Sequence, residues 1–243
     1  MNRRRKTIIA LAGAAAVAVA VCATNLVVEH QAEQRVAEVA SCRLKPRGPV
    51  QADLTTPLAG LRALGGDVGD VDVHAEGVRR QDVVMDVAVS LKGVTTDGAS
   101  DGGTADATIG YDQLDRHMGS LGDGLTPGGR DGDLTLSGSV GSLGLPVTVV
   151  AKLSTRTNAV TITPTTVTVL GRSVPVDDLT ALPAAARLKN ELKPRTVAVT
   201  GLPRGVALTS AHAGDDGLVL DFSIARRTAQ GTSNRSKAGC AAA

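Results

Sequence analysis

The chain has 243 residues, of which 42% are hydrophobic and 21% charged, and this composition fits one globular domain with an additional apolar segment. It contains one tyrosine, one phenylalanine and no tryptophan, which argues against a surface that binds nucleic acid by stacking aromatic rings on bases. From Cys42 onward, 21 Lys and Arg residues balance 21 Asp and Glu residues, so we expect no basic field that attracts a polyanion.

The N-terminal region consists of a basic tip followed by a long apolar segment. Residues 1–7 include three arginines and one lysine, and residues 8–28 contain no charged side chain. This apolar length is just sufficient to cross a bilayer, and the preceding positive charges favour a cytoplasmic N-terminus. We therefore expect an uncleaved single-pass anchor at 8–28, a helical linker at 29–41 and an extracytoplasmic domain at 42–224.

Two other outcomes for the apolar segment stay open. Cleavage after Ala20 or Ala23 would release a secreted protein, and lipid attachment at Cys22 would make a lipoprotein. Lipid attachment is disfavoured because Val21 stands where lipoprotein signals usually have a small residue. The sequence EHQAEQRVAEVA that follows the segment continues a helical pattern, which favours the uncleaved anchor.

The three cysteines differ in their setting. Cys22 lies within the apolar segment, whereas Cys42 begins the exported domain and Cys240 is close to the C-terminus. An oxidising compartment would allow a disulfide between Cys42 and Cys240. The alternative is two unpaired thiols, because a sequence does not give the distance between Cβ atoms that a disulfide requires.

The first part of the exported domain predicts a short helix followed by a β-hairpin. A helix is expected within residues 54–66, where a Thr-Pro pair can begin it and a glycine can end it. Alternating apolar residues then predict strands at 71–75 and 83–91. Residues 95–104 are rich in Gly and Asp and predict a mobile loop.

The middle of the chain predicts a second helix and then the central strands. Residues 111–118 are expected to be helical, 119–132 to form a second glycine-rich loop, and 134–140 to form a strand. The two-residue period of Val and Ile within 145–175 predicts a meander of antiparallel strands that are buried on one face.

Breaks in that period are expected to fall in three short segments. Residues 154–158 and 164–165 are turn-forming, and Gly171 ends the strands before a helix that begins near Val176.

The last part of the chain returns to alternating apolar residues. Strands are predicted around 197–199, 206–208 and 218–224, and residues 225–243 predict a disordered tail.

One short motif matches a catalytic signature. Residues 98–102 (GASDG) fit the nucleophile elbow G-x-S-x-G, which would make Ser100 a nucleophile. That motif requires a buried strand before the serine and a helix after it, and the flanking sequence predicts neither. A flexible loop is therefore the simpler interpretation.

Metal and cofactor motifs are absent from the sequence. His30, His74, His117 and His212 are scattered without the spacing of a metal site or a catalytic pair. Residues 128–134 are similar to a calcium-binding glycine-rich repeat but occur once, so we interpret them as a turn that enters a strand. We expect no metal, no cofactor and no enzymatic activity.

Three segments resemble a known family in their order and spacing. They are residues 169–175 (VLGRSVP), 201–208 (GLPRGVAL) and 216–220 (DGLVL). Together with the strand that ends at 87–94, they resemble the LmeA family of phospholipid-binding proteins from actinobacterial envelopes, over about residues 42–224.

The resemblance implies an exported, membrane-associated domain that binds phospholipid and serves envelope lipid or lipoglycan metabolism. The family provides no set of catalytic residues to transfer to this chain. The partners that the resemblance implies are phospholipid and the membrane, not nucleic acid. By analogy with tubular lipid-binding folds, we expect an α+β domain whose long, curved, mostly antiparallel sheet wraps against a few helices. Candidates for an apolar lipid-binding groove are Val147, Val149, Val167, Val169, Leu179, Leu182 and Leu220.

Two alternatives to lipid binding stay open. The same alternation of apolar residues describes a fully packed core, so the chain could be a structural ectodomain without a ligand. A hydrolase that uses Ser100 is the other alternative.

Overall fold

The computed structural model describes residues 33–34, 36–38, 40–42, 46–56, 62–63, 65–80, 82–118, 125–140, 144–180 and 192–228. This part of the chain is mainly β-structure, and all of its strand pairs are antiparallel. The strands are β1 (Val50–Leu54), β2 (Asp67–Arg80), β3 (Val83–Thr95), β4 (Gly102–Gly110), β5 (Leu125–Arg130), β6 (Asp133–Val140), β7 (Leu145–Arg156), β8 (Ala159–Val169), β9 (Arg172–Pro175), β10 (Arg195–Ala198), β11 (Val206–Ala213) and β12 (Gly217–Ile224). The two labelled helices are α3 (Tyr111–Met118) and α4 (Val176–Thr180), and residues near position 40 are also helical.

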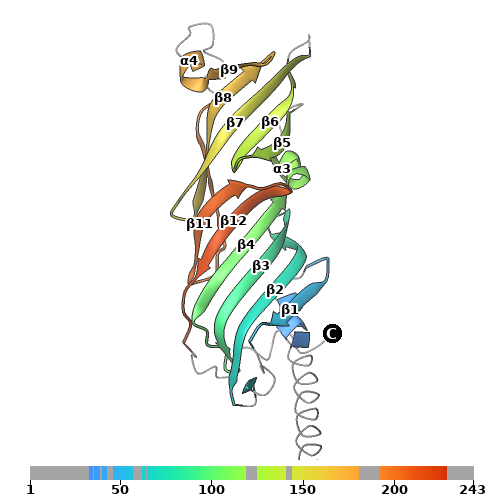
Figure 1. Cartoon of the computed structure of the whole chain (residues 1–243), viewed down its shortest axis with the longest axis vertical. Helices are drawn as coiled ribbons and strands as arrows, with labels where there is room; N and C mark the ends of the chain where they lie inside the picture. Colours follow the sequence, from blue (N-terminus) through green and yellow to red (C-terminus); the bar gives the residue numbers. More distant parts are fainter. Residues whose placement is uncertain are drawn as a thin grey trace, which may run out of the picture.

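The strands form two sheets that lie end to end along the long axis of the molecule (Figure 1). The first sheet has the order β1-β2-β3-β4-β12-β11, so the C-terminal hairpin returns to pair with β4. The second has the order β10-β8-β7-β6-β5, and β9 also pairs with β8. Within the described residues, neither sheet closes on itself.

Tight turns join the strands of the second sheet. Two-residue hairpin loops with positive φ at both central residues match the right-handed twist of the strands they connect. Glycine or asparagine occupies the second position of each turn, where positive φ costs these residues least. The three turns are Asp131 with Gly132, Thr157 with Asn158, and Leu170 with Gly171.

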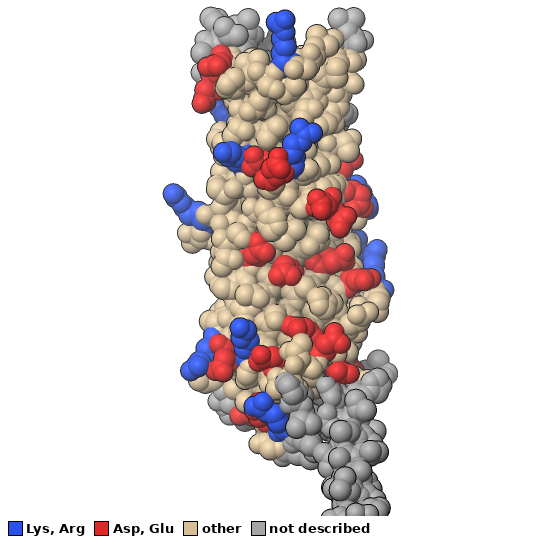
Figure 2. Space-filling view, viewed as in Figure 1, with Lys and Arg blue, Asp and Glu red and all other residues tan. Residues whose placement is uncertain are grey.

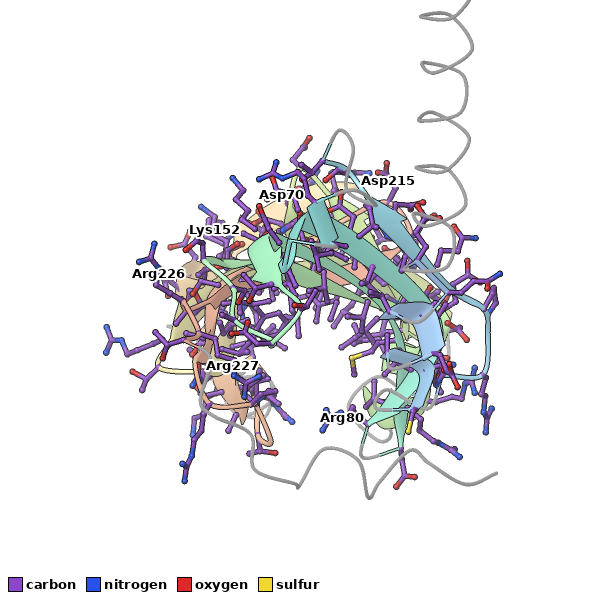
Figure 3. All side chains as sticks on the ribbon, turned by 90° about the horizontal axis from the view of Figure 1, so that it is seen from below. Asp70, Arg80, Lys152, Asp215, Arg226 and Arg227 are labelled. Carbon is purple, nitrogen blue, oxygen red and sulfur yellow. The ribbon has the colours of Figure 1, made fainter. Side chains whose placement is uncertain are left out.

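Both sheets curve in the same sense and form an arch that is open on one side in the view along the long axis (Figure 3). Asp70 and Lys152 point outward from this arch, whereas Arg80 points into it. We call the inner side of both sheets the concave face and the outer side the convex face. Figure 2 looks at the convex face and shows Asp and Glu side chains spread over the first sheet.

Backbone and side-chain hydrogen bonds connect the two sheets. The side-chain oxygen of Asn158, in the β7–β8 turn, accepts a hydrogen bond from the backbone N–H of Leu208 at 3.0 Å. Ala213 of β11 donates its N–H to the carbonyl of Gly132 at 2.9 Å. These contacts fix the second sheet against the edge strand of the first.

The only tyrosine of the chain lies at the same junction. The hydroxyl of Tyr111 donates a hydrogen bond to the carbonyl of Gly214 at 2.6 Å. Partial burial raises the pKa of this phenol above its ordinary value, and the negative charges of Asp215 and Asp216 raise it further. A Cβ atom at Gly129 would collide with the Tyr111 hydroxyl, so only glycine allows this close approach.

Several predicted elements are confirmed. The helix at 111–118, the strand at 134–140, the antiparallel strands within 145–175, the helix at Val176 and the three late strands are all present. Residues 128–134 contain the hairpin turn between β5 and β6, at Asp131 and Gly132, and lead into strand β6 as expected. The predicted curved antiparallel sheet is also confirmed in outline, but the described residues form two open sheets instead of one.

Four element predictions were wrong in part. Leu54 ends strand β1 instead of beginning a helix, because residues 50–54 pair along β2. The predicted loop at 95–104 is shorter, since β4 begins at Gly102. Residues 125–130 form strand β5 although they are rich in glycine.

Pro164 does not end a strand. It lies inside β8 next to a break in register opposite β7, where a β-bulge removes the need for its missing N–H donor.

The predictions for the N-terminal anchor and linker concern mostly residues outside the described part of the chain. Residues 1–32 are not described, and within the described ranges no helix is long and apolar enough to cross a membrane. The predicted tail begins with four described residues, among which Ala225 donates its N–H to Gly205 O at 2.7 Å. Residues 229–243 lie outside the described residues.

Candidate functional site

The concave face of the first sheet is built from alternate residues of its strands. Directly opposed residues of antiparallel strands lie on the same face, so the register defines rows of side chains across the sheet. One such row crosses all six strands and is apolar: Ala52, Val73, Val89, Ala105, Phe222 and Leu208. The next row, on the convex face, is polar except for one alanine: Asp53, Asp72, Ser90, Thr104, Ser223 and Ala207.

The second sheet extends this apolar surface. Its concave face also carries a row of opposed apolar residues: Pro127, Leu136, Val149, Val167 and Val174. At the junction, Leu153 and Ile162 of the second sheet pack against the buried cluster that contains Leu220 and Phe222 of the first. The two concave faces therefore form one apolar surface along the molecule.

The two ends of this surface are covered by helical residues. At the upper end in Figure 1, Val176 and Leu179 of α4 pack on a cluster that includes Val147, Val149 and Val167. At the other end, Val36, Ala37 and Ala40 of the N-terminal helical residues pack on the cluster of Leu54 and Val71. These contacts make both ends part of the hydrophobic core.

The middle of the concave face combines buried and half-buried apolar side chains. Ala107, Leu220 and Phe222 are buried there. Five apolar side chains of β3, β4 and β11 are half-buried: Met85, Val87, Val89, Ala105 and Leu208. Half-buried apolar side chains gain free energy when a further apolar group covers them. This region is therefore the part of the face that is best suited to contact an apolar ligand.

The residues predicted to line a groove lie on the concave face or on the helix that covers it. Val147, Val149 and Val167 are buried, and Val169 and Leu179 are half-buried beside them in the upper cluster. These five side chains pack mainly on one another.

The remaining two predicted residues lie apart from that cluster. Leu220 is buried in the first sheet, within the junction cluster, and Leu182 lies outside the described residues. The structure thus places the six described residues of this set in two separate clusters of the core.

The half-buried residues of the first sheet were not among the predicted site residues. Their alternation was visible in the sequence, since it predicted the strand at 83–91. What the sequence did not contain was the position of α4 and of the N-terminal helical residues, which decides which apolar positions are covered.

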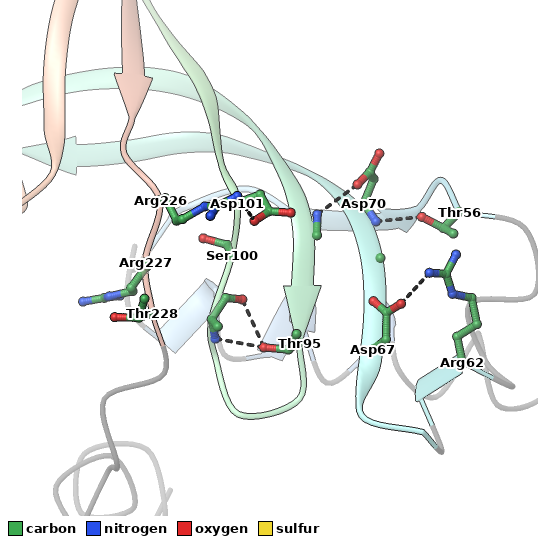
Figure 4. Close-up of a pocket in the computed structure, with 13 residues that line it drawn as sticks. Thr56, Arg62, Asp67, Asp70, Thr95, Ser100, Asp101, Arg226, Arg227 and Thr228 are labelled. Carbon is green, nitrogen blue, oxygen red and sulfur yellow. Dashed lines mark hydrogen bonds and ion pairs between the residues drawn. The ribbon is translucent and has the colours of Figure 1, made fainter.

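A polar cleft of about 680 Å³ lies at the lower end of the first sheet (Figure 4). It is lined by three arginines and three aspartates: Arg62, Arg226, Arg227, Asp67, Asp70 and Asp101. Two of these arginines form ion pairs within the lining, Arg62 with Asp67 and Arg226 with Asp101 at 2.9 Å. The opposite charges largely balance, so the cleft has no strong preference for one sign of charge.

Ser100 lines this cleft but lacks the surroundings of a nucleophile. It lies in the connection between β3 and β4, where its backbone pairs with that of Arg227, so neither the strand-to-helix turn nor its strain is present. Among the described residues that line the cleft there is no histidine. In the same connection, a hydrogen bond from the Thr95 hydroxyl, with help from the Ala99 N–H, lowers the pKa of Asp97.

The histidines do not form a metal site in the part of the chain that the structure describes. There, no group of three or more His, Cys, Asp or Glu side chains could hold a metal ion. His212 lies 3.3 Å from a carboxylate oxygen of Asp221 on the convex face, which is an ordinary surface pair.

Cys42 forms a disulfide whose partner lies outside the described residues. The specific pairing with Cys240 therefore stays a prediction.

Comparison with known protein families gives one result that covers most of the chain. The family described as LmeA-like phospholipid-binding matches residues 23–223, a range that includes nearly all of both sheets. Neither the curated proteins nor the solved structures contain a match. The family match agrees with the motifs at 169–175, 201–208 and 216–220, and the chain therefore belongs to the LmeA-like phospholipid-binding family.

Proposed function

We propose that this protein binds phospholipid by holding the acyl chains against the middle of its concave face. The observation that carries the proposal is the half-buried apolar region of β3, β4 and β11, which lies between two ends that helical residues cover. Family membership supports phospholipid as the ligand. The geometry adds the part of the surface that would meet the acyl chains.

The binding energy should come mainly from apolar burial. Each acyl methylene that leaves water contributes ~0.8 kcal/mol, and the side chains it covers gain in the same way. The positions of the strands that face inward in this region carry no carboxylate, so an acyl chain would not have to desolvate one. Retention of lipid should therefore persist at high salt, which screens exposed charges but leaves burial unchanged.

Lipid content of the purified protein tests the proposal. The full chain is purified and extracted, and the extract is examined by mass spectrometry for phospholipid in amounts comparable to the protein. A protein that contains no phospholipid and takes up none from vesicles would contradict the proposal. It would favour the second candidate function, a structural ectodomain without a ligand. In that case the alternating apolar residues of the strands would form only a hydrophobic core.

We propose further that the chain is anchored in the cell membrane by residues 8–28, with its domain outside the cytoplasm, and that it serves envelope lipid or lipoglycan metabolism. The uncharged apolar segment behind a basic tip supports this arrangement. N-terminal sequencing of protein isolated from membranes tests it. A sequence that begins near Thr24 would mean that the segment is cleaved and the protein is secreted.

We propose a binding role without catalysis. Ser100 is the only residue that matches a catalytic signature, and it lacks the strand-to-helix turn of that signature as well as a histidine partner among the described residues that line the cleft. Labelling of the protein by a serine-reactive probe, lost in Ser100→Ala, would favour a hydrolase instead.

A further inference from the structure

The convex face of the first sheet carries more acidic than basic residues, although Arg79 and Lys92 also lie on it. Acidic residues of five strands lie on the convex face: Asp53, Asp72, Asp86, Asp106 and Asp221. Two pairs of them are directly opposed, Asp53 with Asp72 and Asp106 with Asp221. Opposed like charges destabilise a sheet, so folding alone does not favour this arrangement.

Charged residues on the concave face are basic. Arg80 is opposed to Val83, Arg172 to Val169, and Arg195 to Ile162, and these pairings place all three arginines on the concave side. From Val71 of β2 onward, the inward-facing positions of the described strands hold no carboxylate.

The three arginines of the concave side are exposed, and so is Arg227. Arg80 and Arg227 point into the open side of the arch from its two opposite limbs (Figure 3). The backbone of Arg227 is held by its pairing with Ser100, which fixes where this side chain begins. Between the two limbs lies the half-buried apolar region.

We propose that the open, concave side of the protein docks onto an anionic phospholipid bilayer and takes up lipid sideways through the opening of the arch. The arginines contact headgroup phosphates, which the guanidinium group binds with two parallel hydrogen bonds. The acidic convex face points away from the negative membrane surface. This inference rests on the proposed function, since docking places the acyl-binding region against its source of lipid.

Charge complementarity selects the bilayer over a second copy of the chain as the partner of this face. Two concave faces in contact would bring arginines together without any carboxylate from the inward-facing strand positions to neutralise them. An anionic bilayer supplies that negative charge, and its acyl region covers the apolar side chains.

The absence of tryptophan from the chain gives a direct test of orientation. Val83 and Val84 are adjacent residues of β3 on the concave and the convex face, opposed to Arg80 and Arg79 respectively. Full-length Val83→Trp and Val84→Trp proteins are reconstituted into vesicles that contain brominated phosphatidylcholine, with or without phosphatidylglycerol. Phosphatidylglycerol should increase quenching in Val83→Trp and leave Val84→Trp nearly unchanged.

Charge substitutions and salt separate docking from lipid that is already bound. In the Val83→Trp protein, Arg80→Ser and Arg227→Ser should each weaken docking about 5-fold, the effect expected of one basic residue at an anionic surface. Lys152→Ser, which removes a cation from the convex face, should not. High salt should abolish the increase caused by phosphatidylglycerol, whereas quenching by lipid held in the apolar region should persist.

Three outcomes would overturn docking. The first is equal quenching in vesicles with and without phosphatidylglycerol, and the second is stronger quenching of the Val84→Trp protein than of the Val83→Trp protein. The third is a dimer, shown by cross-linking, in which the Val83→Trp indole is shielded from solvent when no vesicles are present. Phospholipid content of the unsubstituted protein is measured separately. A protein that contains phospholipid but shows no dependence on phosphatidylglycerol refutes docking alone, and one without phospholipid refutes the proposed function.

Discussion

Val87→Asp is the most direct test of the acyl-binding region. Val87 is half-buried in the middle of the concave face, opposed to Ala75 on one side and Ala107 on the other. Because position 87 is half-exposed, the carboxylate of the new aspartate stays hydrated when no lipid is bound to the concave face. A bound acyl chain would have to desolvate that carboxylate or lose contact with this part of the strand.

The expected loss of affinity follows from strand geometry. A residue on one face of a strand occupies about 6.6 Å, twice the rise of roughly 3.3 Å per residue. About five methylenes of an extended acyl chain cover this length, and losing their contacts costs about 4 kcal/mol at ~0.8 kcal/mol each. Binding should therefore weaken by roughly a thousand-fold.

The assay measures phospholipid per protein after purification and after incubation with vesicles. Val150→Asp is the matched control, because Val150 lies on the convex face between Thr135 and Thr166. Thermal unfolding of both variants establishes that they fold. Val149→Asp is less suitable, since Val149 is buried in the upper cluster and a carboxylate there would destabilise the fold itself.

The reasoning is refuted if folded Val87→Asp protein retains as much phospholipid as the unsubstituted chain. Equal losses in Val87→Asp and Val150→Asp would also refute it, because the two faces would then not differ in function.

Three further predictions concern stability. Since the folded pKa of Tyr111 is raised, the stability that depends on its protonated phenol is fully present below the unfolded pKa of about 10 and is lost as pH rises through the higher folded value. Tyr111→Phe should remove that dependence in urea unfolding and lower stability at neutral pH by about 1 kcal/mol, and an unchanged alkaline profile would contradict the assignment. Asn158→Ala should destabilise the protein by about 2 kcal/mol, because it removes an acceptor at the junction of the sheets and leaves alanine at positive φ; an unchanged urea midpoint would count against this contact. A disulfide between Cys42 and Cys240 should stabilise the fold by roughly 5 kcal/mol in the chain-entropy picture, and peptide mapping that pairs Cys42 with another cysteine would exclude it.

The sequence predicted the faces of the strands better than the extent of the strands. Alternation places Val87 and Val149 on one side of their strands and Ser90 and Val150 on the other, because side chains of a strand project with a period of two. The register then confirms that the first two lie on the concave face. Any sheet with this sequence would have one apolar face.

Strand ends were less predictable because they depend on partners elsewhere in the chain. Gly102 and Gly103 were predicted to lie in a loop, but they belong to β4 and pair with β3 and β12. Pro164 was predicted to end a strand, but it lies within β8, where a β-bulge opposite β7 accommodates it. A local pattern does not contain these pairings.

The sequence predicted the apolar character of the candidate site but not which residues are accessible in it. An apolar surface was expected, but separating its core from its accessible part requires knowing where α4 and the helical residues near Ala40 pack. These contacts join segments that are far apart in sequence, and periodicity alone does not give them.

The half-buried middle of the concave face has a consequence for the life of the protein in the cell. Domains are usually built from at least two packed layers, and among the described residues this sheet layer is only partly covered by protein. If lipid occupies this region, it acts as the missing layer, and ligand at 100 times its Kd adds about 2.7 kcal/mol to the free energy of unfolding. A shortage of lipid would then expose the chain to proteases, so the abundance of the protein would follow the supply of the lipid it carries.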